Sequence, residues 1–362
     1  MPETRNPDLK PTAHTSFDPE TDLVDLKGKV IIVTGGNAGI GFATVRHLLR
    51  ARAGKVYLAA RDEGRAKNAI KLLNDEGLGK DGSGSEVLWH KLELGDPAKT
   101  KLSAEQFLRK ESRLDVIVNN AGGLLSVQIG KEGVNHQHLV NYISPYIFTK
   151  TLLPLLKKTA QEPNSDVRIV NLSSEVHFRV PAGAKFKTVE DFNVPYKWHI
   201  YPGMTRYGHA KLAMTLWSRK LQEDLLPSES LPNGIAVISL HPGVVDTFSV
   251  RFPGPFKGIA RFFFRTVFGF IAPEHGSYTS LFAAASKKVL DERERYQAGW
   301  GAYLHDGPVP GSVLEPSADA LNDRTPNIPL KVRSPGTSLA RTPLRQFGPD
   351  LRQHFRPKTL ER

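Results

Sequence analysis

Two short segments of the sequence place a tyrosine four residues before a lysine. They are YGHAK at 207–211 and YIFTK at 146–150. On a helix, residues four apart lie on one face, so each pair could bring a phenol close to an ammonium group. A nearby ammonium favours tyrosinate and lowers the pKa of a tyrosine, which at its usual pKa of about 10 is a poor base at neutral pH. Either pair could do proton chemistry, and spacing alone does not choose between them.

A glycine-rich turn near the start of the chain indicates a phosphate site. The segment TGGNAGIG, residues 34–41, follows an apolar run and leads into a stretch with helical spacing. Gly35, Gly39 and Gly41 have the spacing G-x-x-x-G-x-G, which permits a tight strand-to-helix turn and lets backbone N–H groups approach a pyrophosphate. The strand before and the helix after make this pattern specific, so it predicts dinucleotide binding.

The end of the next apolar run bears on the choice between the two nicotinamide cofactors. An NAD site usually ends this strand with an acidic residue that holds the ribose 2′-hydroxyl. The segment VYLAARD places Ala60 and then Arg61 there, and a guanidinium suits a 2′-phosphate. We therefore expect NADP(H). Asp62, one place later, keeps NAD(H) as the less favoured alternative.

These segments need a sheet to position them. From residue 28 onward, short β-branched runs alternate with longer stretches of helical spacing. We expect six strands before residue 243, at 29–36, 55–61, 86–94, 114–122, 166–174 and 235–243. Continuously apolar strands separated by helices are typical of a parallel sheet covered on both faces. The predicted fold class is α/β, with a single Rossmann-type doubly wound parallel sheet and helices on both faces.

The bulk composition fits a soluble globular protein and narrows the chemistry. Of 362 residues, 40% are hydrophobic and 24% charged. There is no cysteine, which excludes disulfides, thiolate nucleophiles and cysteine-ligated metals, and we expect no metal site. The formal net charge of +12 is uneven, because residues 331–362 carry eight Lys or Arg against Asp350 and Glu361. A basic segment so poor in apolar residues predicts a flexible tail.

We expect three parts along the chain. They are a polar N-terminal arm at 1–27, a Rossmann domain at 28–322 with substrate loops at 175–206 and 248–275, and a basic, flexible tail at 323–362. The apolar stretch 258–272, interrupted by Arg261 and Arg265, fits either a lid helix over an apolar pocket or an interfacial helix. Because no signal peptide or spanning run is visible, we expect a cytoplasmic protein, with peripheral membrane contact left open. The tail lacks interleaved aromatics and a recognisable motif, so no nucleic-acid partner is expected.

Five segments together resemble the short-chain dehydrogenase/reductase family, over roughly residues 28–320. They are TGGNAGIG at 34–41, NNAG at 119–122, RIVNLSS at 168–174, YGHAK at 207–211 and HPGVVDT at 241–247, in the family's order. The most similar branch is the retinol-dehydrogenase-like one, which includes many fungal reductases. The resemblance implies hydride transfer between a nicotinamide cofactor and a carbonyl or alcohol, a reaction that needs an acid or base at the substrate oxygen.

The resemblance implies four catalytic residues. Tyr207 would be the acid/base, and Lys211 would lower its pKa and bond the cofactor ribose. Ser174, rather than the adjacent Ser173, would polarise the substrate carbonyl. Asn141 would hold a water in a proton relay behind the lysine.

The order of these segments also separates the two tyrosine–lysine pairs. Tyr207 follows the serine strand and begins a long helix, as the family pattern requires. Tyr146 precedes that strand and lies in an apolar helix stripe, where an aromatic is most often part of the core. We therefore predict that the pair at 207–211 is chemical and that Tyr146 packs in the core.

The same resemblance implies a set of cofactor contacts. Besides Tyr207 and Lys211, the set comprises Gly35, Asn37, Gly39, Ile40, Gly41, Arg61, Glu93, Leu94, Asn120, Ala121, Gly122, Pro242, Gly243, Val245 and Thr247. One member departs from the family, because Glu93 stands at the adenine position where an aspartate is common. The longer carboxylate would keep the adenine contact with shifted geometry.

A second departure is the long segment between Ser174 and Tyr207, which are 33 positions apart. It adds six aromatic residues close to the reactive centre: Phe178, Phe186, Phe192, Tyr196, Trp198 and Tyr201. These suggest a wall for an apolar, cyclic substrate, with a packed surface loop as the alternative.

The expected function is that of an NADP(H)-dependent oxidoreductase. It would interconvert a carbonyl and an alcohol on an apolar small molecule that is retinoid-like, steroid-like or polyketide- or terpenoid-like. The alternative is an NADP-binding scaffold or sensor of the same fold without turnover, with the terminal segments as docking arms. Members of this family often pair through their long helices, which leaves a homodimer or tetramer open.

Overall fold

A computed structural model of the chain describes residues 17–80, 84–126, 128–245, 271–299, 301–305 and 312–314. Three expectations therefore lie wholly or mainly outside the described residues: Thr247 as a cofactor contact, the second substrate loop up to residue 270, and the basic tail at 323–362.

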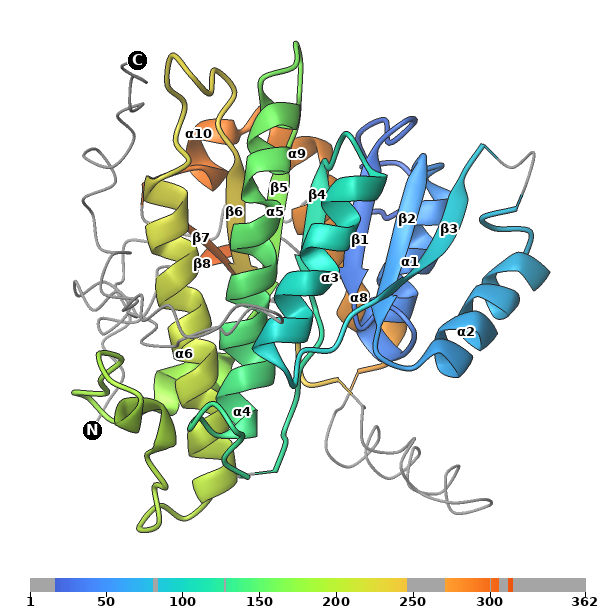
Figure 1. The fold of residues 1–362 in the computed structure, drawn as a ribbon. Coiled ribbons are helices and arrows are strands. Elements are labelled where there is room, and N and C mark those ends of the chain that lie inside the picture. The colour runs from blue at the N-terminus through green and yellow to red at the C-terminus, as the bar shows by residue number, and fades with distance from the viewer. Residues whose placement is uncertain are drawn as a thin grey trace, which may run out of the picture.

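The strands form one sheet of eight in the order β3-β2-β1-β4-β5-β6-β7-β8 (Figure 1). Their bounds are β1 Val30–Thr34, β2 Lys55–Ala60, β3 Glu86–Lys91, β4 Val116–Asn119, β5 Arg168–Leu172, β6 Ala236–Leu240, β7 Ala302–His305 and β8 Ser312–Leu314. All neighbouring pairs are parallel except β7 and β8, which are antiparallel. The six expected strands are confirmed, and the fold is the expected α/β doubly wound one. The antiparallel edge strand was not foreseen.

Helices cover both faces of this sheet. One face carries α1 (Gly39–Arg50), α2 (Glu63–Asp75) and α8 (Pro273–Ala285). The other carries α3 (Pro97–Lys110), α5 (Ser144–Ala160) and α6 (Pro202–Glu223), which stand in front of the sheet in Figure 1. Shorter elements complete the described fold: α4 His136–His138, η1 Leu139–Ile143, η2 Glu175–Arg179, η3 Glu190–Asn193, α9 Lys287–Asp291 and α10 Arg293–Tyr296.

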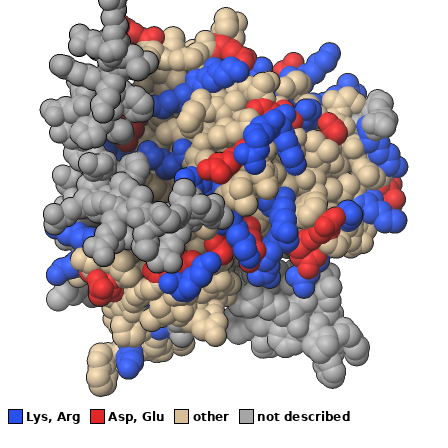
Figure 2. Space-filling view, in the orientation of Figure 1, with Lys and Arg blue, Asp and Glu red and all other residues tan. Residues whose placement is uncertain are grey.

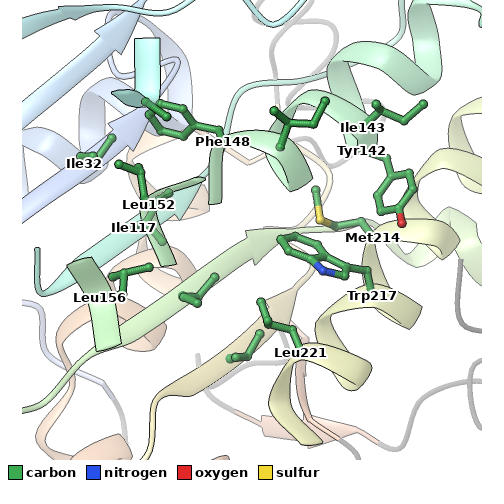
Figure 3. Close-up of a cluster of buried hydrophobic side chains, with 14 of the residues drawn as sticks. Ile32, Ile117, Tyr142, Ile143, Phe148, Leu152, Leu156, Met214, Trp217 and Leu221 are labelled. Carbon is green, nitrogen blue, oxygen red and sulfur yellow. The ribbon is translucent and has the colours of Figure 1, made fainter. Parts of the chain in front are cut away.

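The central strands are apolar on both faces because each face is buried under helices. Ile31 and Val33 of β1 pack under α1 and α8, whereas Ile32 between them packs on the opposite side. Figure 3 shows Ile32 and Ile117 with Phe148 of α5 in that second core. This alternation explains why the strands contain continuous apolar runs.

Part of the expected N-terminal arm belongs to the folded domain. The Phe17 ring packs edge-on against Phe282 of α8 at 5.3 Å between centroids. Leu23 and Leu26 are buried in the same core, and the Val24 amide donates to the Ala285 carbonyl at 2.8 Å. The domain therefore begins earlier than residue 28, because these apolar side chains cover the end of α8.

A fully buried arginine joins the start of β5 to the end of α8. The Arg168 guanidinium makes two hydrogen bonds to Asp166, at 2.9 and 2.6 Å, and donates to the carbonyls of Ala283 and Ser286 at 3.2 and 2.9 Å. The guanidinium holds the pKa of Asp166 below its usual value, although burial acts in the opposite direction and is the largest single influence. All four hydrogen bonds are charge-assisted, so Arg168 fastens β5, the strand that precedes Ser174, to the end of α8.

Removing this guanidinium should destabilise the fold strongly. Arg168→Met leaves the Asp166 carboxylate and two buried carbonyls without their donors, and we expect a loss of about 3–5 kcal/mol in the free energy of unfolding. Chemical denaturation of both proteins measures it. Arg109→Met, at an exposed position of α3, is the control and should change stability by less than about 0.5 kcal/mol. A similar small change for Arg168→Met would contradict this account.

Candidate active site

The predicted serine, tyrosine and lysine meet beyond the carboxyl end of β5. Ser174 follows the strand and caps η2, and Tyr207 and Lys211 lie one turn apart near the start of α6. The Lys211 ammonium lies 5.5 Å from the centroid of the Tyr207 ring and donates to the Leu172 carbonyl at 2.7 Å. Parallel strands place ligand sites at this edge of the sheet, so the position suits a reactive centre.

A glycine allows α6 to approach the serine segment closely. A Cβ on Gly208 would lie 2.6 Å from the Val176 carbonyl oxygen of η2. Any larger residue at 208 would therefore push α6 away from η2. Tyr207 directly precedes Gly208 in α6, and Ser174 directly precedes η2. The close approach that Gly208 permits therefore keeps the Tyr207 and Ser174 hydroxyl groups within reach of each other.

The two serines of NLSS have different surroundings. The Ser173 hydroxyl points into α6, where it donates to the Lys211 carbonyl at 3.1 Å and pairs with the Thr215 hydroxyl at 2.8 Å. The Ser174 side chain instead interacts with Tyr207. Ser173 thus fastens α6 to β5, and Ser174 is the serine that faces the tyrosine.

Burial controls the pKa values of the tyrosine and the lysine. It raises the pKa of Tyr207 to about 12, and hydrogen bonding with Ser174 lowers it only in part. It lowers the pKa of Lys211 to about 7. The sequence led us to expect that the lysine charge lowers the tyrosine pKa. In the structure burial prevails for both groups, because each charged form would lose its hydration. At neutral pH Tyr207 therefore carries its proton.

Asn141 lies in η1, a single π-helical turn between α4 and α5. Its amide nitrogen donates to the carbonyls of Gly123 at 3.0 Å and Gln137 at 2.8 Å, and its oxygen accepts from the Gly123 amide at 2.8 Å. A Cβ on Gly122 would overlap the same oxygen and lie 3.4 Å from the Lys211 nitrogen. Asn141 is thus fully buried behind the lysine, and the contacts that the structure gives it hold the loop after β4. Isolated π-turns are often found at functional sites.

The glycine-rich turn has the geometry expected of a phosphate cradle. Gly35 and Gly39 have positive φ angles of 66° and 56°, a region that favours glycine. A Cβ on Gly41 would overlap the Asn120 amide and lie 2.5 Å from the Gly35 carbonyl oxygen. The N-cap residue Ala38 makes no side-chain hydrogen bond, so the first N–H groups of α1 are left for a ligand.

The segment after β4 closes one side of this turn. The Asn120 side chain donates to the Thr34 carbonyl at 2.7 Å, and the Ala121 amide donates to the Thr34 hydroxyl at 3.0 Å. These bonds place the predicted residues Asn120, Ala121 and Gly122 between the glycine turn and Lys211.

The segment after β6 closes the other side. Gly243 has a φ of 87°, and Val245 is buried. A Cβ on Gly276 of α8 would lie 2.5 Å from the Val245 side chain, 3.4 Å from that of Ile40 and 3.4 Å from the Pro242 carbonyl oxygen. The structure thus brings Pro242, Gly243 and Val245 next to the start of α1.

Two predicted adenine contacts lie at the end of β3. Leu94 is buried in the core, and the Glu93 carboxylate pairs with Lys99 at 3.0 Å. The lysine directs the Glu93 carboxylate toward the start of α3. The structure therefore buries Leu94 in the core and gives the Glu93 carboxylate a partner within the chain.

A cavity of about 230 Å³ extends from the glycine turn toward α2. It is lined by Asn37, Ala38, Phe42, Arg65, Asn68, Ala69 and Leu72. Arg61 is exposed at the end of β2 and does not line it, whereas Arg65 does. Sequence reasoning missed Arg65 and Asn68, although their spacing of three on α2 places both on one helix face.

Taken together, these residues fit a nicotinamide dinucleotide. The cradle offers uncapped N–H groups for a pyrophosphate, and the cavity beside it contains a guanidinium for a further anionic group. Among the described residues, the only hydrogen bond of the Lys211 ammonium is to the Leu172 carbonyl, which leaves two donors for ribose hydroxyls.

Sequence reasoning also missed His177 and Gln137, which hold the segments that carry the candidate catalytic residues. The His177 Nδ1 donates to the Ser174 carbonyl at 2.7 Å, and burial lowers its pKa to about 4. Gln137 donates to the Gly123 carbonyl and accepts from the Leu125 amide, both near 2.8 Å. The only sequence signal for His177 is its position three residues after Ser174, and no local sequence pattern indicates a role for Gln137.

The second tyrosine–lysine pair is partly buried, and Tyr146 packs against the edge of the core. The Tyr146 ring packs against Trp217 at 5.3 Å, and burial raises its pKa. Burial lowers the pKa of Lys150 in the same way. Tyr142 and Trp217, neighbours of this site, are visible in the core of Figure 3. The pair at 146–150 therefore packs as expected.

The six aromatic residues between Ser174 and Tyr207 differ widely in burial. Phe186 and Phe192 are buried in the core and do not form an exposed wall. Trp198 and Tyr201 point outward and are 99% and 74% exposed. Phe178 is 42% exposed, lies four residues after Ser174 and packs on His177 at 4.1 Å. Tyr196 is half-buried and packs against His209 at 5.7 Å, so Phe178 is the exposed ring nearest to Ser174 in the sequence.

Comparison with known proteins gives consistent matches. The family model described as short chain dehydrogenase matches residues 29–185. A short-chain dehydrogenase/reductase of Armillaria gallica is 39% identical over 83% of this chain and 89% of its own length. An uncharacterised oxidoreductase of Schizosaccharomyces pombe is 36% identical over 75% of this chain and 76% of its own.

Solved structures of low identity share the fold. A short chain dehydrogenase of Pseudomonas syringae, described as putative, aligns with a TM-score of 0.55 at 22% identity, covering 81% of this chain and all of that one. An NADPH-bound carbonyl reductase from chicken fatty liver aligns with a TM-score of 0.54 at 23% identity, covering 83% of this chain and 99% of that one. The fold, the order of the five segments and the fungal relatives agree: this chain is an oxidoreductase of the short-chain dehydrogenase/reductase family and belongs to the branch that includes fungal reductases.

Proposed function

We propose that this protein is an NADP(H)-dependent oxidoreductase that interconverts a carbonyl and an alcohol on an apolar small molecule. The observation that carries the proposal is the meeting of Ser174, Tyr207 and Lys211 beside the glycine cradle. The cofactor, when bound, supplies or accepts the hydride. The residues of this chain bind and orient the reactants and handle the proton at the substrate oxygen.

The roles follow from the surroundings of each group. Ser174 donates a hydrogen bond to the substrate carbonyl oxygen and polarises it. Tyr207, protonated because burial raises its pKa to about 12, gives its proton to the same oxygen as negative charge develops there. Lys211 holds the cofactor ribose, and Asn141 keeps the loop behind the lysine in place. A protonated tyrosine suits the reductive direction, in which an alkoxide must be neutralised.

An apolar substrate fits the part of the site that the structure describes. Phe178 exposes its ring beside the serine segment, and its neighbour Tyr303 packs against it at 5.9 Å. Apolar and aromatic walls with a few polar groups are typical of small-molecule sites. The substrate class that we propose is a lipophilic ketone or aldehyde of retinoid, steroid, polyketide or terpenoid type.

The direct test is a cofactor titration followed by a carbonyl screen. Binding of NADPH and NADH to the full chain is measured first, and a panel of lipophilic ketones and aldehydes is then assayed through oxidation of the reduced nicotinamide. Turnover of at least one lipophilic carbonyl is the expected result. Tight NADPH binding without turnover across the panel would favour a sensor or scaffold instead.

The choice of NADP(H) over NAD(H) rests on two arginines. Arg61 directly follows β2, at the position where we expect a 2′-phosphate, and Arg65 lines the cavity beside Asn37. We expect the double variant Arg61→Ala/Arg65→Ala to weaken NADPH binding by about 10–100-fold and NADH binding by less than about threefold, because only the 2′-phosphate loses its partners. Lys67→Ala, on the exposed face of α2, is the matched control. Equal losses for both cofactors would contradict the assignment.

A further inference from the structure

The chain between the serine strand and the tyrosine helix exposes an unusual group of apolar side chains. Residues 194–204, here called the tip, contain five of the eleven large apolar side chains that are exposed in the described part of the chain. Three of them, Trp198, Ile200 and Tyr201, are the most exposed of all, at 99%, 89% and 74%. Leaving a tryptophan and an isoleucine in water forgoes about 1.5–3 kcal/mol each relative to burial, which indicates an interaction site.

Hydrogen bonds and a ring contact hold the tip in a defined conformation. The His199 amide donates to the Tyr196 carbonyl at 3.0 Å and closes a turn. The Arg206 guanidinium donates to the Pro195 carbonyl at 2.6 Å, which ties the turn to α6. The Tyr196 ring packs against the buried His209 at 5.7 Å. The base of the tip is thus anchored in the core, and the outward direction of Trp198 and Ile200 follows from that anchoring.

The charged side chains of the tip and of the first turn beyond it are positive, whereas the acidic Glu190 and Asp191 lie in η3, before the tip. Residues 194–206 contain Lys197 and Arg206 and no acidic residue. In Figure 2 the lowest part of the molecule, where this loop lies below α6 in Figure 1, shows tan surface with blue groups and no red. Exposed tryptophan and tyrosine beside cations are the residues that proteins place at the boundary between lipid head groups and acyl chains.

We propose that the tip docks the protein on an anionic lipid surface, with Trp198 and Ile200 inserted at the level of the head groups. A lipid surface requires no shape complementarity, and its negative charge complements Lys197 and Arg206. No helix of the described residues has the length and apolar character to cross a bilayer.

Docking at this place would bring the membrane to the reactive centre. The tip lies between Ser174 and Tyr207 in the sequence and ends three positions before Tyr207, and these two residues carry the groups that would contact the substrate carbonyl. An apolar substrate dissolved in the bilayer could then reach the site without crossing water. This last step rests on the proposed function, whereas the docking itself rests only on the tip.

Vesicle binding of the full chain tests the proposal. We expect sedimentation with vesicles of phosphatidylcholine and phosphatidylglycerol, and at least tenfold weaker binding to phosphatidylcholine alone. The double variant Trp198→Ser/Ile200→Ser should weaken binding to the anionic vesicles at least tenfold. Ile129→Ser, which removes an apolar side chain that is 62% exposed elsewhere, is the matched control and should leave binding unchanged.

A second readout shows which segment touches the lipid. Brominated acyl chains quench the fluorescence of a tryptophan that they touch. Vesicles that contain them should therefore quench the tryptophan fluorescence of the wild-type protein and leave that of Trp198→Phe unquenched. Absence of vesicle binding, unchanged binding of the double variant, or quenching that persists in Trp198→Phe would each overturn the proposal. So would a wild-type dimer that the double variant converts to a monomer, because the tip would then cover a second copy of the chain. Tyr207→Phe should still bind vesicles, which separates docking from the proposed reaction.

Discussion

Tyr207→Phe is expected to reduce kcat by about 10²–10⁴-fold while leaving cofactor affinity and the fold intact. The substitution removes one oxygen, the group that would donate the proton to the substrate oxygen, and keeps the ring. The ring continues to pack beside Lys211, whose ammonium lies 5.5 Å from its centroid. Steady-state kinetics with the best carbonyl of the screen, together with NADPH titration, separates the loss of chemistry from a loss of binding.

The second tyrosine–lysine pair supplies a matched control for this experiment. Tyr146→Phe removes the same oxygen from a tyrosine that also precedes a lysine by four positions. Since Tyr146 packs on Trp217 at the edge of the core, kcat should change by less than about threefold, with at most a small change in stability. Turnover that survives in Tyr207→Phe, or an equal loss in both variants, would contradict the assignment of the acid.

The fold could be predicted because its determinants are local. The runs VIIVT at 30–34 and RIVNL at 168–172 are buried on both faces, and their lack of alternation already indicated a covered parallel sheet. The glycine cradle was predictable for a similar reason, since Gly35, Gly39 and Gly41 are needed by the turn itself. Lys211 and Ser174 were identified by their order along the chain.

Other features could not be predicted because they depend on contacts between distant segments. The π-turn at Asn141 shows no local sequence signal, and its hydrogen bonds reach the loop after β4. Leu23 and Leu26 look like part of a polar arm until α8 covers them. The exposed position of Trp198 follows from the anchoring of Tyr196 and Arg206, which the aromatic composition of the segment does not reveal.

Burial of the Lys211 ammonium lowers the stability of the folded protein. Lys211 is 3% exposed, and burial lowers its pKa from a usual value of 10.5 to about 7. In the unfolded chain the same ammonium is hydrated and keeps its proton up to pH 10.5. Between pH 7 and 10.5 the unfolded state therefore binds more protons than the folded state, so stability rises with pH across this window. Below pH 7 the folded protein carries the buried ammonium charge, and the full cost of burying that charge is subtracted from the free energy of unfolding.

Lys211→Met should accordingly inactivate the protein and stabilise it. Turnover should fall by about 10²-fold or more, because the ribose and the tyrosine lose their partner. Removal of a buried ammonium should raise the free energy of unfolding by at least about 1 kcal/mol at pH 7, out of the roughly 5 kcal/mol to which the pKa shift corresponds. Urea denaturation without added nucleotide, repeated between pH 6 and 10, measures this difference and should show it shrinking as the pH rises through the window. Lys157→Met, at an exposed position of α5, provides the control with no stabilisation. A variant that is less stable than the wild type at pH 7 would show that the bond from the Lys211 ammonium to the Leu172 carbonyl outweighs the cost of burying the charge.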